Sequence, residues 1–185
     1  MLDLYNQHLG HRHLEVGPGS GWYLANTTAM QPGPAHITLM DLNPTPLSFT
    51  ARRIEAADRV VESVCGSVLD AVPAEAGTGY ESVGINFVLH CVPGNFAEKG
   101  VAFRHLANIL GDEGVLFGST ILGRRRTPRT LFGRALTAVY GRVGAFNNRD
   151  DDRDELEDAL KEAFGEYSIT DVGDVTLFTA RRPRR

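Results

Sequence analysis

The sequence has few cysteines, no long apolar run and no excess of basic residues. Two cysteines, Cys65 and Cys91, are present among 185 residues, which excludes a dense disulfide framework and the cysteine spacing of a zinc site. No run of 18 apolar residues occurs, so no membrane span is expected. The segment Met1–Tyr5 lacks the basic residues and long apolar core of a signal peptide. We therefore expect a cytoplasmic protein without a structural metal.

The charge balance is mildly acidic, with 19 Lys and Arg against 23 Asp and Glu and a net charge of −4. Nucleic-acid-binding domains usually present a basic face, so neither nucleic acid nor a membrane is the expected partner. The basic clusters at 124–126 and 181–185 are interpreted as a solvated loop and a tail. A chain of 185 residues with 42% hydrophobic and 23% charged residues fits one globular domain spanning 1–185.

A glycine-rich turn follows the first buried segment. Leu14 and Val16 are typical of the end of a strand, and the next five residues are Gly-Pro-Gly-Ser-Gly. Glycine is needed where the backbone takes positive φ or where a ligand approaches it closely. A turn of this kind between a parallel strand and a helix places backbone N–H groups at the carboxyl edge of a sheet, where nucleotide-like ligands bind.

Strand and helix patterns alternate along the chain, which predicts a doubly wound α/β fold. Expected strands end at Val16 and cover 36–40, 60–65, 82–89 and 114–122. A closing pair of short strands lies within 167–180. Expected helices cover 2–9, 22–30, 44–57, 95–110, 130–143 and 150–164. Asp41 ends the second strand, 20 residues after Gly21, where a carboxylate accepts the two hydroxyls of a ribose. A helix cap or turn is its alternative role.

The pattern Glu15-x-Gly17-x-Gly19-x-Gly21 closely resembles the first motif of class I S-adenosylmethionine-dependent methyltransferases of the small-molecule type. The resemblance implies a Rossmann-like, seven-stranded, mostly parallel sheet with a C-terminal antiparallel hairpin in a three-layer αβα sandwich. It implies S-adenosyl-L-methionine as cofactor and S-adenosyl-L-homocysteine as product. The cofactor-binding residues it implies are Glu15, Gly17, Pro18, Gly19, Gly21, Asp41, Leu42, Ser67, Val68, Asn86 and Phe87. Ser67 stands where relatives often carry an acid.

His90 and Cys91 follow the expected fourth strand, and the resemblance places them toward the methyl acceptor. The ordinary pKa of histidine, near 6.5, suits a proton acceptor at neutral pH, so His90 is the candidate catalytic residue. A structural histidine is its alternative, and Cys91 fits a buried small hydrophobe better than a nucleophile. The segment 123–149 is predicted to be a helical insertion that builds the acceptor pocket, with Tyr140 and Asn147 as candidates.

The expected function is methyl transfer to a small molecule, by analogy with tailoring enzymes of natural-product pathways. A binding protein that kept the fold without catalysis is one alternative. A nicotinamide-dependent oxidoreductase is the other alternative. The glycines of that class follow the spacing i, i+2, i+5, whereas Gly17, Gly19 and Gly21 follow i, i+2, i+4. Little sequence precedes the first strand, so either the lid over the site is minimal or another chain supplies it. A homodimer therefore stays open.

Overall fold

The protein is described by a computed structural model that places residues 1–28, 36–55, 59–123 and 147–185. A single seven-stranded sheet runs through the molecule in the order β3-β2-β1-β4-β5-β7-β6. The strands are β1 (Arg12–Val16), β2 (His36–Asp41), β3 (Val60–Cys65), β4 (Tyr80–Asn86), β5 (Leu110–Thr120), β6 (Phe164–Val172) and β7 (Val175–Pro183). The expected doubly wound sheet is confirmed.

The first five strands are parallel, and the last two form an antiparallel hairpin. β1 lies between β2 and β4, so the order reverses beside the first strand, where open α/β sheets bind ligands. β7 pairs antiparallel with both β5 and β6. The hairpin expected within 167–180 is therefore present, and it is longer at both ends.

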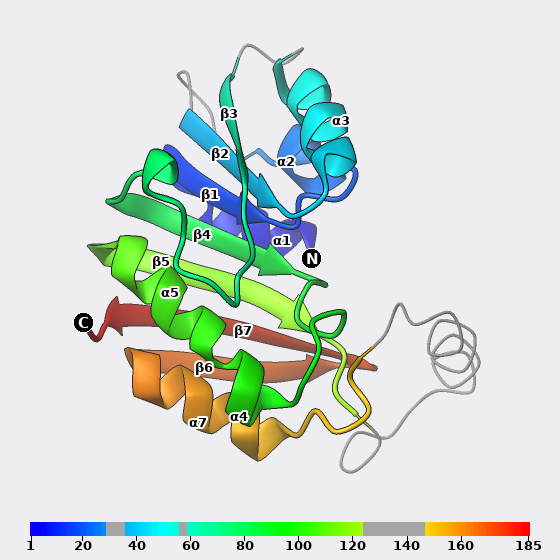
Figure 1. The fold of residues 1–185 in the computed structure, drawn as a ribbon, viewed down its shortest axis with the longest axis vertical. Coiled ribbons are helices and arrows are strands. Elements are labelled where there is room, and N and C mark those ends of the chain that lie inside the picture. The colour runs from blue at the N-terminus through cyan, green and yellow to red at the C-terminus, as the bar shows by residue number, and fades with distance from the viewer. Residues whose placement is uncertain (29–35, 56–58, 124–146) are drawn as a thin grey trace.

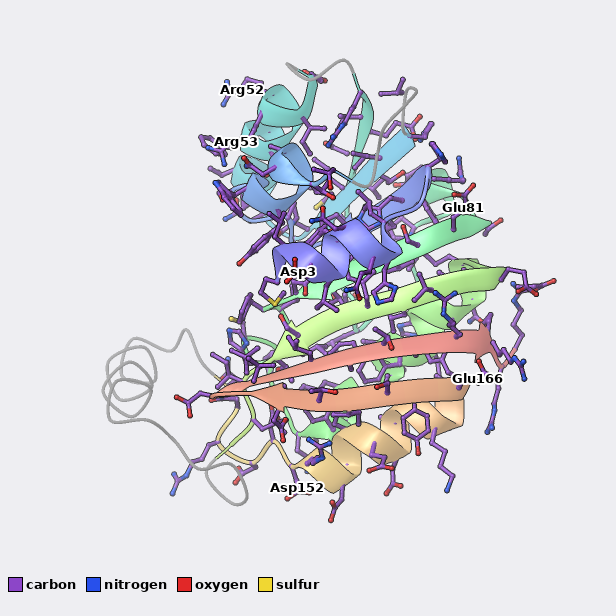
Figure 2. The ribbon with its side chains drawn as sticks, turned by 180° about the vertical axis from the view of Figure 1, so that it is seen from behind. Asp3, Arg52, Arg53, Glu81, Asp152 and Glu166 are labelled. Carbon is purple, nitrogen blue, oxygen red and sulfur yellow. The ribbon has the colours of Figure 1, made fainter. Side chains whose placement is uncertain are left out.

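Helices cover both faces of the sheet, as expected for a three-layer sandwich. The described helices are α1 (Leu2–His8), α2 (Trp22–Asn26), α3 (Pro44–Glu55), the 3-10 turn η1 (Ala74–Ala76), α4 (Phe96–Lys99), α5 (Val101–Ile109) and α7 (Arg153–Ala163). In Figure 1, α4, α5 and α7 lie in front of the sheet. Figure 2 shows the opposite face, where α1, which carries Asp3, lies across the strands.

Each face has its own apolar core, because successive side chains of a strand point to opposite faces. Leu14 and Val16 of β1 pack with side chains of α5 and α7. Ile37 and Leu39 of β2 pack with side chains of α1, α2 and α3. The remaining inward positions of β1, His13 and Glu15, are polar and fully or almost fully buried on the α1 face.

Several predicted boundaries are wrong. β4 ends at Asn86 and not at Leu89, because Phe87 has φ 59°, a left-handed conformation that leaves the strand. The helix expected over 95–110 is two helices that meet at Gly100. A Cβ there would lie 2.7 Å from Ala159 Cβ, so the glycine lets α7 pack closely. β5 begins at Leu110, directly after α5.

Two further helix predictions differ at their ends. α2 ends at Asn26 because Thr27 is extended, and residues 29–30 of the expected helix lie outside the described part. α7 starts at Arg153, where the side chain of Asp152 accepts a hydrogen bond from Asp154 N at 2.8 Å, an ordinary N-cap. The helix expected over 130–143 and the basic cluster 124–126 also lie outside the described residues. No helix of the described chain is long and apolar enough to cross a membrane.

Candidate functional site

A cavity of about 230 Å³ opens at the carboxyl edge of the sheet. It lies between the ends of β1, β2 and β3 and the turn that follows β4. Its lining residues are Val16, Gly17, Met40, Asp41, Leu42, Gly66, Ser67, Val68, Leu69, Val88, Cys91, Val92 and Pro93. The walls are mostly apolar, with a carboxylate and a hydroxyl on the side of β2 and β3. Such a mixture suits a flat heteroaromatic group attached to a hydroxylated one.

The glycine turn after β1 is left-handed at all three glycines, with φ between 54° and 66°. At Gly17 a Cβ would overlap Val88, and at Gly21 it would lie 2.6 Å from Thr50 Cγ2 of α3. At Gly19 a Cβ would meet nothing within 4 Å. Gly17 and Gly21 therefore serve the close approach of protein segments, whereas Gly19 leaves open space beside the turn.

The polar groups on the β2 and β3 side are held by short local contacts. Asp41 Oδ1 accepts a hydrogen bond from Asn43 N at 2.8 Å, which fixes the carboxylate at the end of β2. Ser67 Oγ accepts one from Leu69 N at 3.1 Å. Leu42 is 68% exposed, as expected of a side chain that covers a ligand face. Five of the predicted cofactor residues thus line one cavity: Gly17, Asp41, Leu42, Ser67 and Val68.

Glu15 is placed differently from the cofactor contact that the resemblance implied. Its carboxylate is buried beneath α1, where one oxygen accepts from Tyr5 OH at 2.7 Å and the other lies 2.9 Å from His13 Nε2. Asn86 Nδ2 donates to the same Tyr5 oxygen at 3.1 Å. Glu15, Pro18, Gly19, Gly21, Asn86 and Phe87 do not line the cavity of about 230 Å³, although all of them lie on β1, β4 or the turns after them.

The turn after β4 supplies the opposite wall and is held by Lys99. This lysine is fully buried, and its Nζ donates to Leu89 O at 2.8 Å and to Val92 O at 3.4 Å. It also lies 2.7 Å from the Asp151 carboxylate. Burial lowers the pKa of Lys99 and raises the pKa of Asp151, because their mutual attraction offsets only part of the desolvation. The pair ties the turn to the residues before α7.

Asn147 strengthens the same junction. Its backbone N donates to His90 O at 2.7 Å, and its side-chain Nδ2 donates to Cys91 O at 2.9 Å. Gly123 N donates to Asp151 O at 2.9 Å. The residues that precede position 124 and those that follow position 146 therefore lie next to each other beside the turn. Asn147, predicted as a substrate contact, lies at the site, but its amide nitrogen is used on the backbone.

His90 lies in this turn and not on the strand. Its side chain is 4% exposed and contacts Phe87 edge to face, with ring centroids 6.0 Å apart. Burial and the neighbouring Lys99 ammonium lower the pKa of His90 to about 4. The ordinary value near 6.5 assumed above is therefore wrong, since the imidazole stays neutral down to strongly acidic pH.

Cys91 is exposed and lines the cavity, in contrast to the buried hydrophobe that was expected. Although the residue is exposed, partial desolvation of its thiol raises the pKa of Cys91, which disfavours the thiolate. Tyr140 lies outside the described residues.

The sequence analysis did not predict Val88, Val92 and Pro93 as wall residues of the cavity, because it continued the fourth strand to Leu89. The Pro93-Gly94 pair was the available signal for an earlier turn.

The fold is a Rossmann-like domain with a cavity at the point where the strand order reverses, which is where open α/β sheets bind nucleotide-type ligands. A family model described as "Methyltransferase domain" matches residues 14–118. This range begins within β1 and contains the glycine turn, β2 to β4 and most of β5. The chain therefore belongs to the methyltransferase family, as a class I S-adenosylmethionine-dependent member.

Named relatives match almost the whole chain. Demethylluteothin O-methyltransferase of Streptomyces thioluteus is 38% identical over 177 residues, which cover 96% of this chain and 75% of the relative. The physcion biosynthesis cluster O-methyltransferase of Aspergillus chevalieri is 34% identical over 184 residues, which cover 100% of this chain and 81% of the relative. Both are O-methyltransferases by name.

Solved structures share the fold at lower identity. An O-methyltransferase family protein from Burkholderia thailandensis superposes with a TM-score of 0.73 at 23% identity, over 99% of this chain and 55% of its own. This chain thus spans about half the length of that protein. The N-methyltransferase NodS from Bradyrhizobium japonicum, solved with S-adenosyl-L-homocysteine, superposes with a TM-score of 0.62 at 16% identity, over 93% and 78% of the two chains.

Proposed function

We propose that the protein transfers the methyl group of S-adenosyl-L-methionine to a hydroxyl oxygen of a small molecule of the natural-product type. The observation that carries the proposal is the cavity at the carboxyl edge, in which Asp41 and Ser67 face apolar walls beside the glycine turn. The names of the 38% and 34% identical relatives support the oxygen acceptor and the natural-product context.

The residues present fit the cofactor. The open space at Gly19 leaves room beside the turn, and Asp41 places a carboxylate where a ribose would present two hydroxyls. Leu42, Val68 and Val88 offer apolar surfaces for an adenine ring. When bound, the cofactor supplies a methyl group on a sulfonium, which is already a reactive electrophile.

The protein's own task is then to hold the acceptor in line with that methyl group and to exclude water. The turn after β4 suits this task, because its backbone is held at four successive carbonyls. Lys99 donates to those of Leu89 and Val92, and Asn147 donates to those of His90 and Cys91. A neutral His90 is able to accept a hydrogen bond from a hydroxyl group. With its pKa near 4, orienting the acceptor suits it better than complete removal of a proton.

The test has two stages. Calorimetric titration with S-adenosyl-L-homocysteine and, separately, with NAD decides the cofactor: binding of the first alone is expected, and binding of NAD alone would contradict the proposal. Transfer of a labelled methyl group to a panel of phenolic and enolic acceptors then decides the activity. Cofactor binding with no transfer to any acceptor of the panel would favour the non-catalytic alternative.

His90 has its own test once an acceptor is found. The His90→Gln variant should bind the cofactor normally and transfer methyl groups more slowly. Between pH 5 and 8 the ratio of parent to variant rates should stay constant, because the parent imidazole does not titrate there. A ratio that rises through pH 6.5 would instead make His90 a titrating base, and a ratio of one would remove it from the site.

A further inference from the structure

The connection between β3 and β4, residues 66–79, has little secondary structure of its own. It follows β3, an edge strand in which Val64 is the one buried residue among six. The connection contains the 3-10 turn η1 and no α-helix, and it crosses the front of the sheet toward α5 (Figure 1). Its position therefore depends on contacts with other segments.

The first residues of this connection form one wall of the cavity. Four of them line it: Gly66, Ser67, Val68 and Leu69. Within the turn, Leu69 N donates to Ser67 Oγ at 3.1 Å, and Asp70 N donates to Ser67 O at 3.2 Å. These local hydrogen bonds give the turn its shape, but they do not determine how far it lies from the opposite wall, the turn after β4.

His105 of α5 supplies a contact that does. Its Nδ1 lies 3.0 Å from Val68 O, and because a carbonyl oxygen only accepts, this nitrogen carries the proton and donates. Among the described residues, it is the one side-chain hydrogen bond between residues 67–70 and another segment. The Val68 side chain is 6% exposed and belongs to the same apolar core as α5, so both contacts act on one residue of the wall.

The helix that carries His105 is a firm support. Phe103 and Leu106 of α5 are fully buried in the core against the sheet, and buried side chains are packed too densely to shift freely. The opposite wall is held from the neighbouring helix α4, where Lys99 donates to the carbonyls of Leu89 and Val92. Both walls of the cavity are thus held by side chains of two consecutive helices.

We propose that His105 is a positioning residue for cofactor binding. Through Val68 O it sets the distance between the two walls of the cavity, and with that distance the fit of the ring system that lies between them. His105 is not among the residues that line the cavity, so it acts through Val68 and not by touching the ligand. The inference rests on the proposed cofactor and adds a residue of α5 to the groups on which its binding depends.

The test uses three substitutions of His105 and calorimetric titration with S-adenosyl-L-homocysteine. His105→Leu removes the donor and should weaken binding by about fivefold, because a contact can shift the position of the turn by no more than its own free energy, that of one ordinary hydrogen bond. His105→Asn should recover most of the affinity, since its side-chain N–H takes about the place of Nδ1. His105→Asp has the same shape without that N–H and should bind as weakly as His105→Leu.

The matched control is at the other end of the same connection. Arg12 Nε donates to Thr78 O at 3.2 Å, a similar bond from a side chain to a carbonyl, but at the amino edge of the sheet. Arg12→Met should change the affinity by less than about twofold. Urea denaturation of both variants separates a loss of stability from a loss of binding. Once an acceptor is known, His105→Leu should raise the KM for the cofactor and leave kcat nearly unchanged.

The outcomes separate this inference from the proposed function. If the parent does not bind S-adenosyl-L-homocysteine, the proposed cofactor and this inference both fall. If the parent binds it and His105→Leu keeps the parental affinity, or Arg12→Met loses as much as His105→Leu, the positioning role is wrong and the proposed function stands. Should His105→Leu not fold, the pair of His105→Asn and His105→Asp decides, and equal affinities of these two variants would overturn the positioning role.

Discussion

The two halves of the site are held together in different ways. The half that we propose to bind the cofactor, called the cofactor half below, comprises the glycine turn, Asp41 and Ser67. Its groups are held by hydrogen bonds to residues two positions away or by close backbone approach. The half that we propose to bind the acceptor, called the acceptor half below, comprises the turn after β4 and residues 147–151. It is held by Lys99 and Asn147, whose contacts join segments up to 57 residues apart.

This difference separates what local sequence determines from what tertiary packing determines. Short turns and their caps are encoded by the residues that form them, so the cofactor half keeps its shape as long as its strands are in place. The acceptor half depends on a buried charge pair, which is costly when either partner is missing. We therefore expect substitutions in the acceptor half to affect folding most, and those in the cofactor half to affect binding most.

The largest expected effect is on Lys99. Lys99→Met leaves the Asp151 carboxylate buried without its cation and should lower the free energy of unfolding by about 3–5 kcal/mol. Urea denaturation measures the change. Lys99→Met combined with Asp151→Leu should recover more than half of the loss, because no uncompensated charge remains.

The matched control is the exposed ion pair of Arg104 and Glu162, whose side chains are 57% and 65% exposed. Arg104→Met should change the free energy of unfolding by less than about 1 kcal/mol. Equal losses in Lys99→Met and Arg104→Met would remove the proposed distinction between the two halves.

His90 should make the acceptor half sensitive to acid. Its pKa of about 4 in the folded protein is below the ordinary 6.5, so the unfolded chain binds the proton more readily between these values. The stability contributed by His90 is complete above pH 6.5 and is lost as the pH falls to 4, by up to about 3 kcal/mol. The difference in unfolding free energy between parent and His90→Gln, measured from pH 4 to 7.5, isolates this contribution from that of Asp151, and a difference independent of pH would contradict it.

Asp41 should show the opposite behaviour, with an effect on binding and none on folding. Asp41→Ala should weaken binding of S-adenosyl-L-homocysteine by about 1.5–3 kcal/mol, the range for hydrogen bonds to charged groups. Asp70→Ala is the matched control, since Asp70 is a nearby exposed acid outside the cavity lining. A folded Asp41→Ala variant with unchanged affinity would exclude the residue from the site.

Within the glycine turn, the expected loss of stability is smaller at Gly19 than at Gly21. Both Gly19→Val and Gly21→Val force a side chain into a left-handed conformation, at about 1–2 kcal/mol, but only Gly21→Val also meets Thr50. Gly19→Val should therefore remain folded and lose cofactor binding, whereas Gly21→Val should be the less stable of the two. Thermal unfolding and titration together measure this order, and normal cofactor binding by Gly19→Val would show that the open space is not used.

Much of the fold could be predicted because its signals are local. The apolar segments at 36–41 and 60–65, the glycine turn and the Asp152 cap each specify their own element. The end of β4 could not be predicted in this way. Phe87 is a residue that normally favours strands, and it leaves the strand here in a left-handed conformation that the pattern Asn-Phe-Val-Leu does not indicate.

The candidate site shows the same difference between residues with local sequence signals and residues placed by tertiary packing. Asp41 was predicted because it ends the second strand, and the resemblance implied Leu42, Ser67 and Val68. The order of the strands brings these four residues to one cavity. The position of Glu15 on β1 was predicted, but its hydrogen bonds to Tyr5 and His13 were not, since they depend on how α1 packs over this strand. The pKa of His90 was also beyond the sequence, because it depends on burial and on Lys99.

The place of β7 between β5 and β6 has a consequence for synthesis of the protein. During translation, β5 leaves the ribosome about 60 residues before the strand that pairs with its free edge, at the usual rate of 5–20 residues per second. For several seconds that edge is open to pairing with other chains, a known route to aggregation. A chain stopped after Val172 should keep this state permanently, and its aggregation, followed by light scattering against the full chain, would measure how much protection the last strand gives.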